Sequence, residues 1–103
     1  GVKVSTIADS LGPPLHLPLS FALVRDYVDE IVTVSDQAMI DGIGLIARDL
    51  KLAVEPAPAA GVAALLGPLR RALAGKRVGL VICGANIDPV TFGRYLAAAR
   101  PVS

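Results

Sequence analysis

Apolar residues recur along this chain with two different spacings. From 36 to 50 they fall three or four positions apart, as on one face of a helix, and Ser35 stands in front of them as an N-cap. Residues 77–83, RVGLVIC, are apolar without alternation. That pattern is typical of a strand buried on both faces of a parallel sheet. The chain is therefore expected to combine helices with buried strands.

The other elements follow from shorter patterns and from residues that start or stop a helix. Ser20 and Asp88 are placed as N-caps, and Gly75 as a C-terminal stop. Gly67 and Pro68 should interrupt the helical pattern that spans them. We expect strands at 2–7, 30–34 and 77–83, and helices at 21–28, 36–50, 57–66, 68–74 and 89–99. This order predicts an α/β unit of short strands with flanking helices.

The composition indicates that the chain is part of a larger domain or a subunit that associates. The chain has 103 residues, of which 53% are hydrophobic and 18% charged, against a usual charged fraction of about 25%. So small and apolar a chain covers its own core poorly, so we expect residues 1–103 to form one partial domain that associates, as a homo-oligomer. The net charge of +1 gives no reason to expect nucleic acid or a membrane surface as a partner.

Cysteine content and hydropathy bear on the compartment. A single cysteine excludes an internal disulfide and favours a reducing, cytoplasmic setting. No apolar run approaches the roughly 20 residues of a membrane helix.

The end of the last predicted strand is the candidate site. Ligands of open α/β sheets lie beyond the carboxyl ends of strands, where the next helix begins, and residues 83–86, CGAN, occupy that point. Gly84 would let the backbone approach a ligand closely. Buried cysteine is usually a small core residue, so the pattern alone leaves Cys83 open between packing and binding.

Three blocks, TIADSLGPPLHLPLSFALVRDYVDEIVTVSD, LKLAVEPAPAAGVAALLGPL and GKRVGLVICGANIDPVTF, add a resemblance to this picture. Together, over about residues 4–96, they resemble the C-terminal part of the catalytic region of threonine/serine dehydratases. These are fold type II pyridoxal-phosphate enzymes, and serine racemase is a relative. The resemblance implies a tryptophan synthase beta-like large domain, pyridoxal 5'-phosphate as cofactor and a hydroxy amino acid as substrate. The implied reaction converts L-threonine to 2-oxobutanoate and ammonia.

The resemblance also implies roles for particular residues. Cys83 matches the family's Ser or Cys that hydrogen-bonds the pyridine nitrogen, followed by Gly84. A neutral thiol there does not force the ring nitrogen to hold a proton, whereas a carboxylate would make the ring a stronger electron sink. Glu55, in VEPAPA, matches a Glu-Pro near the ring, and Asn86 is expected to hold the turn through its side chain.

For two further polar residues a structural role is a sufficient explanation. Asp9 matches a recurrent family position, but a turn or cap hydrogen bond explains it. His16 is the only histidine and has neither a second histidine for a metal site nor a triad context. We therefore predict no metal ligands, and because the resemblance places the Schiff-base lysine outside this sequence, we predict no catalytic residue within these 103 positions.

The family's Schiff-base lysine belongs to an N-terminal block that is not in this sequence, so this chain by itself is expected to be inactive. Lys76 begins the strand that Cys83 ends, roughly 23 Å away along it. Lys3 and Lys51 have no matching context. Two alternatives to a dehydratase segment stay open: a serine racemase-like enzyme, and a non-catalytic module for association or regulation.

Overall fold

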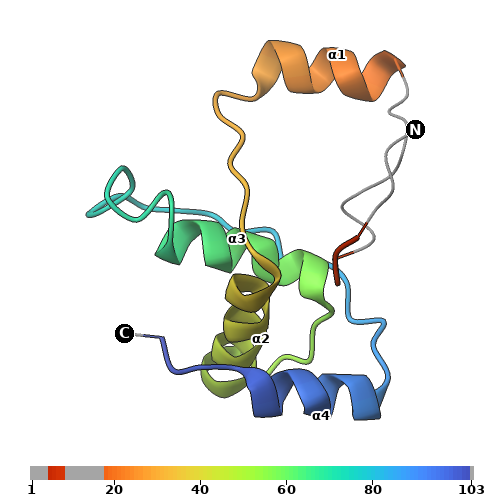
Figure 1. Cartoon of the computed structure of the whole chain (residues 1–103). Coiled ribbons are helices and arrows are strands. Elements are labelled where there is room, and N and C mark those ends of the chain that lie inside the picture. The colour runs from red at the N-terminus through yellow and green to blue at the C-terminus, as the bar shows by residue number, and fades with distance from the viewer. Residues whose placement is uncertain (1–4, 9–17, 103) are drawn as a thin grey trace.

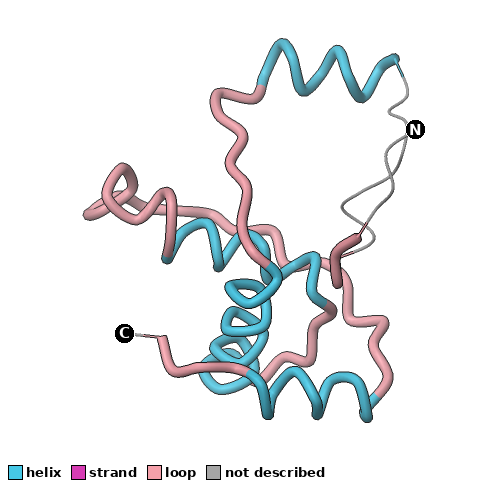
Figure 2. Tube along the Cα trace, in the orientation of Figure 1, coloured by secondary structure: helices cyan, strands magenta, loops and turns pink. Residues whose placement is uncertain are grey.

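The computed structural model describes residues 5–8 and 18–102. Across these two ranges the chain forms helices and no strand (Figures 1 and 2). The helices are α1 (Pro18–Tyr27), α2 (Asp36–Leu50), α3 (Pro56–Leu66) and α4 (Pro89–Ala98). The chain is thus all-helical in its described part, and the predicted α/β arrangement is wrong for it.

Helix α2 is the centre of the molecule, and local signals set both of its ends. The Ser35 hydroxyl accepts a hydrogen bond from the Ala38 N–H at 3.1 Å, and Asp36 places a negative charge in the first turn. Lys51 ends the helix in the left-handed conformation, with φ 59°. The predicted helix over 36–50 with Ser35 as its N-cap is confirmed.

The core lies where α2 packs against α3. Ile43 is fully buried, and Gly42 faces α3 so closely that a Cβ there would lie 3.1 Å from the Ala59 carbonyl oxygen. The glycine therefore lets the two helices approach. The buried apolar residues are Ala8, Met39, Ile43, Ile46, Val54, Ala59, Val62 and Ala63. Ala8 joins them because the Thr6 hydroxyl and the Ile7 N–H both donate to Asp36.

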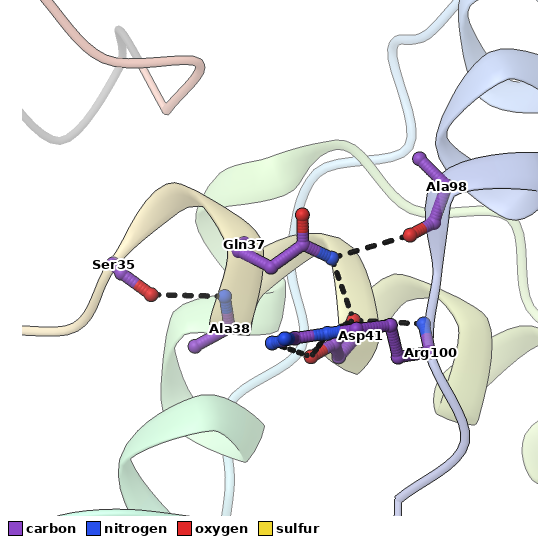
Figure 3. A network of polar contacts seen from close by, with 6 residues as sticks. All are labelled: Ser35, Gln37, Ala38, Asp41, Ala98 and Arg100. Atoms are coloured by element: carbon purple, nitrogen blue, oxygen red, sulfur yellow. Dashed lines mark hydrogen bonds and ion pairs between the residues drawn. The ribbon is translucent and has the colours of Figure 1, made fainter.

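Helix α4 also contacts α2. The segment that follows α4 is held to α2 by hydrogen bonds and an ion pair (Figure 3). The Arg100 guanidinium lies 2.8 Å from Asp41, and the Arg100 N–H donates to the same carboxylate at 2.8 Å. Gln37 donates to both Asp41 and the Ala98 carbonyl. Partial burial raises the pKa of Asp41, but the hydrogen bonds from Arg100 and Gln37 with the Arg100 charge outweigh it and lower the pKa.

The three predicted strands are corrected. Residues 77–83 are neither helix nor strand, and Val81 is 83% exposed rather than buried on both faces. Residues 30–34 are also irregular, with Ile31 74% exposed, and the described end of 2–7 contains no strand. A strand needs a neighbouring strand to satisfy its backbone N–H and C=O groups, and no such ladder forms within the described ranges.

The remaining helices differ from expectation at their edges. Helix α1 begins at Pro18, ahead of the predicted cap Ser20, and contacts none of the other three helices (Figure 1). Helix α3 ends at Leu66, as Gly67-Pro68 predicts. The expected helix over 68–74 is instead a series of turns, which close at Gly75 with φ 75°. The predicted role of Gly75 as a helix stop is therefore wrong, since no helix directly precedes it.

Candidate functional site

Two loops carry the residues that were singled out for cofactor binding. The first leads into α3: Glu55 is the N-cap residue, and Pro56 occupies the first helical position, where a missing N–H costs nothing. The side chain of Glu55 makes no capping hydrogen bond, so its carboxylate is not committed to the helix end. The second loop is the irregular segment that runs from 77 into α4.

The two loops touch at Glu55 and Gly84. The Glu55 N–H donates to the Gly84 carbonyl oxygen at 3.1 Å. The Glu55 side chain lies over the α-carbon of Gly84, because a Cβ built there would be 2.7 Å from Glu55 Oε1. Gly84 has φ 117°, which favours glycine. Two of the three predicted cofactor-binding residues are therefore in direct contact.

Cys83 precedes this contact by one residue. Its thiol is free and exposed, which contradicts the alternative of a buried packing cysteine. The expectation that Cys83 ends a buried strand is also wrong, since 77–83 is irregular. The thiol reaches the surface beside Gly84 through a loop rather than a sheet edge.

The start of α4 fixes the other end of the Cys83 loop. Asp88 Oδ1 accepts from the Thr91 N–H at 2.9 Å, and Oδ2 accepts from the Thr91 hydroxyl at 2.7 Å. These two bonds, the one from the Thr91 hydroxyl first, lower the pKa of Asp88. Asp88 is thereby confirmed as the N-cap. Between Gly84 and Asp88 the chain turns with the Ile87 N–H donating to Ala85 at 3.0 Å.

Other candidates lie apart from the site or outside the described part. Asn86 is exposed in the turn, and its holding role stays a prediction. The Lys51 amine donates to the Arg48 carbonyl at 2.6 Å, which is a helix-end contact. Asp9, His16 and Lys3 lie outside the described residues, so their expected roles stay predictions.

The described ranges contain neither a metal-binding cluster nor a membrane-spanning helix. No group of three or more histidine, cysteine or acidic side chains that could hold a metal ion occurs among them. No helix in the same ranges combines the length and apolar character needed to cross a membrane.

Comparisons with known proteins identify the family to which this chain belongs. Residues 1–84 match the family described as pyridoxal-phosphate dependent enzyme, and the chain belongs to that family. It is 47% identical over 94 residues to the phenylserine dehydratase of Ralstonia pickettii, covering 91% of this chain and 29% of that protein. It is 41% identical over 83 residues to the L-threonine ammonia-lyase of Thermotoga maritima, covering 81% and 20%.

A racemase is also among the relatives. The serine racemase of Schizosaccharomyces pombe is 33% identical over 92 residues, covering 89% of this chain and 28% of that protein. The chain thus spans less than a third of the length of these relatives. The resemblance to dehydratases and serine racemases is confirmed at the level of the family.

The residues present fit one side of a pyridoxal phosphate site. The exposed Cys83 thiol is next to Gly84, and Gly84 contacts Glu55, whose carboxylate makes no capping hydrogen bond. A thiol is a weak hydrogen-bond donor, suited to a neutral ring nitrogen. Sequence reasoning missed the direct contact between Glu55 and Gly84. No local pattern in the sequence signals this contact, because it joins two loops that are far apart along the chain.

Proposed function

We propose that this chain forms part of a pyridoxal-phosphate dependent ammonia-lyase that removes the β-hydroxyl group of a hydroxy amino acid. The products would be a 2-oxo acid and ammonia, as for L-threonine giving 2-oxobutanoate. The observation that carries the proposal is the contact of Glu55 with Gly84 beside the exposed Cys83. Family membership supports the cofactor, and the dehydratase and ammonia-lyase names of relatives support the reaction class.

In this proposal each of the three residues has a separate task. The cofactor, when bound, supplies an electron sink for the substrate's α-carbon. Cys83 would offer its thiol to the pyridine nitrogen without imposing a proton on it. Gly84 would let the backbone pass close to the cofactor ring. The Glu55 carboxylate would lie on the same side of the ring as Gly84. A mild electron sink favours loss of the β-hydroxyl over competing carbanion chemistry.

The lysine that holds the cofactor is assigned to polypeptide outside these 103 residues. Lys51 supports this assignment because its amine is engaged at the end of α2. Lys76 is exposed at the start of the irregular segment, well before Cys83 in the chain. Full activity is therefore proposed only for a polypeptide that joins this chain to a lysine-bearing block.

The test uses that longer polypeptide and two substitutions of one residue. We expect 2-oxo acid release from at least one of L-threonine, L-serine and phenylserine. Cys83→Ser keeps a neutral donor and should retain turnover, whereas Cys83→Asp should lower kcat by about tenfold or more. Equal turnover in Cys83→Asp and the unsubstituted enzyme would refute the role of Cys83, and absence of any 2-oxo acid would refute the reaction class.

A second candidate, racemisation of serine, is favoured by the similarity to serine racemase. Chiral analysis of the same reactions separates the two activities. Accumulation of D-serine from L-serine without 2-oxo acid would establish the racemase in place of the lyase.

A further inference from the structure

The contact between Glu55 and Gly84 joins two loops that are far apart in the sequence. It has two parts: the backbone hydrogen bond from the Glu55 N–H to the Gly84 carbonyl at 3.1 Å, and the approach of the Glu55 side chain to the α-carbon of Gly84. Together they form what is called here the 55–84 contact. It is the point at which the loop before α3 meets the loop before α4.

A side chain at position 84 would overlap the Glu55 side chain in its present position. A Cβ there would lie 2.7 Å from Glu55 Oε1, 3.0 Å from Cδ and 3.1 Å from Cγ. Rotation of the carboxylate would relieve only part of this overlap, because Cγ would also have to move, so the Glu55 side chain as a whole would shift away from Gly84. The φ of 117° adds backbone strain for any other residue. A substitution at 84 therefore incurs two separable penalties, one steric and one conformational.

Gly75 provides a matched reference for the second penalty. It also has a positive φ, of 75°, but a Cβ there would have no atom within 4 Å. Alanine at 75 thus incurs backbone strain alone. An effect of alanine at 84 beyond that of alanine at 75 contains the overlap with Glu55 and the larger backbone strain of φ 117°, and removal of the Glu55 side chain separates these two contributions.

We propose that Gly84 is a positioning residue for Glu55: the missing side chain at 84 is what lets the Glu55 carboxylate lie against the turn that presents Cys83. This deepens the proposed function, on which its relevance to the cofactor rests. It also changes the reason for a glycine at this point. The space that the glycine leaves is filled by Glu55, so the residue serves a protein contact.

Geometry at both ends of the turn supports this assignment. Glu55 holds Gly84, and four residues later Asp88 holds the first turn of α4 through Thr91. The segment between them is fixed at each end although it belongs to no regular element. Cys83, next to Gly84, is therefore placed by the 55–84 contact rather than by a sheet.

The test measures amide hydrogen exchange at residue 55 in the 103-residue chain. Gly84→Ala should speed exchange of this amide by about tenfold or more, and Gly75→Ala should leave it within about twofold of the unsubstituted chain. In Glu55→Ala/Gly84→Ala the overlapping atoms are gone and only the backbone strain at 84 remains. The rescue expected is therefore that Gly84→Ala speeds exchange clearly less in the Glu55→Ala chain than in the unsubstituted chain. Glu55→Gln keeps the shape and should give no such rescue.

The opposite results would overturn the proposal. These are an equal effect of Gly84→Ala and Gly75→Ala at residue 55, or a failure of Glu55→Ala to rescue. If the Gly84→Ala chain does not fold, the unsubstituted chain still decides. A nuclear Overhauser contact between the Gly84 α-protons and the Glu55 γ-protons is expected, and its absence would refute the contact.

A second readout separates this proposal from the proposed function. The same substitutions are placed in the longer polypeptide that holds pyridoxal phosphate, and the absorption band of the bound cofactor is recorded. Gly84→Ala, which displaces the Glu55 carboxylate, should shift the band in the same direction as Glu55→Ala, and a double variant that shifts it no further supports both proposals. Rescue in amide exchange with an unmoved cofactor band would keep the 55–84 contact and refute the cofactor role of these residues.

Discussion

Helix α2 and the segment 77–83 are both rich in apolar residues, but they differ in how deeply these residues are buried. In α2 the apolar face is buried against α3, and Ile43 has no exposed surface. In 77–83, Val78, Leu80 and Val81 are all exposed. A helix satisfies its own backbone hydrogen bonds and needs a neighbour only for its apolar face. A strand needs a paired neighbour as well, so hydrophobicity alone does not determine which segment is buried.

The largest expected effect separates the two regions with one residue type. Ile43→Ala removes fully buried methyl groups and should lower the free energy of unfolding by about 2–5 kcal/mol. Ile31→Ala is the matched control, because Ile31 is 74% exposed, and it should change stability by less than about 0.5 kcal/mol. Urea denaturation followed by circular dichroism measures both. Equal losses would mean that the contrast in burial is false.

A second comparison uses two glycines that lie inside helices. A Cβ at Gly44 would lie 2.6 Å from the Ala99 Cβ, whereas one at Gly93 would meet nothing within 4 Å. Gly44→Ala should therefore destabilise by about 1–3 kcal/mol through overpacking. Gly93→Ala should stabilise by about 0.5–1 kcal/mol through helix propensity. Adding Ala99→Gly to Gly44→Ala should restore stability, and the same denaturation assay would expose a failure to do so.

The cap of α2 tests whether local signals hold the packed region. Ser35→Ala removes the acceptor for the Ala38 N–H and should reduce stability by about 1 kcal/mol. Ser35→Asp keeps an acceptor at the N-terminus and should lose little. Helix content during thermal unfolding reports the difference. If alanine and aspartate behave alike, capping does not contribute at this end.

The smallest expected effect concerns the attachment of the C-terminal segment. The pKa of Asp41 is lowered in the folded chain, so its contribution is complete above the unfolded value of about 3.9 and is lost as pH falls through the folded pKa. Asp41→Asn should abolish this acid-sensitive part of stability, and Arg100→Gln should reduce it. The effect is small because Arg100 is 67% exposed. Denaturation midpoints at pH 7 and pH 3 test this, and an unchanged acid sensitivity in Asp41→Asn would contradict it.

Local chemistry in the sequence predicted α2, the end of α3 and the start of α4, but neither the start of α1 nor the turns that replace the helix expected over 68–74. Ser35 and Asp88 cap the helices predicted after them, and Gly67-Pro68 ends α3 as expected. The strands could not be obtained in the same way. The pattern of 77–83 is that of a strand, but pairing depends on segments elsewhere, and none pairs with it in the ranges that the structure describes.

For the candidate site, the residues could be predicted but their arrangement in space could not. Cys83, Gly84 and Glu55 were identified through a resemblance to a family, which carries information that spacing does not. The contact between Glu55 and Gly84 could not be predicted, because the distance between the two loops depends on how α3 and the turns after it return the chain. Homo-oligomerisation stays a prediction, consistent with the exposed apolar residues of α1.

The most direct test of this account is an experimental structure of the longer polypeptide with pyridoxal phosphate bound. We predict that the Cys83 sulfur lies within hydrogen-bonding distance of the pyridine nitrogen, with the Glu55 carboxylate still packed against Gly84. A pyridine nitrogen bonded to a different residue, with Cys83 turned away from the ring, would contradict it.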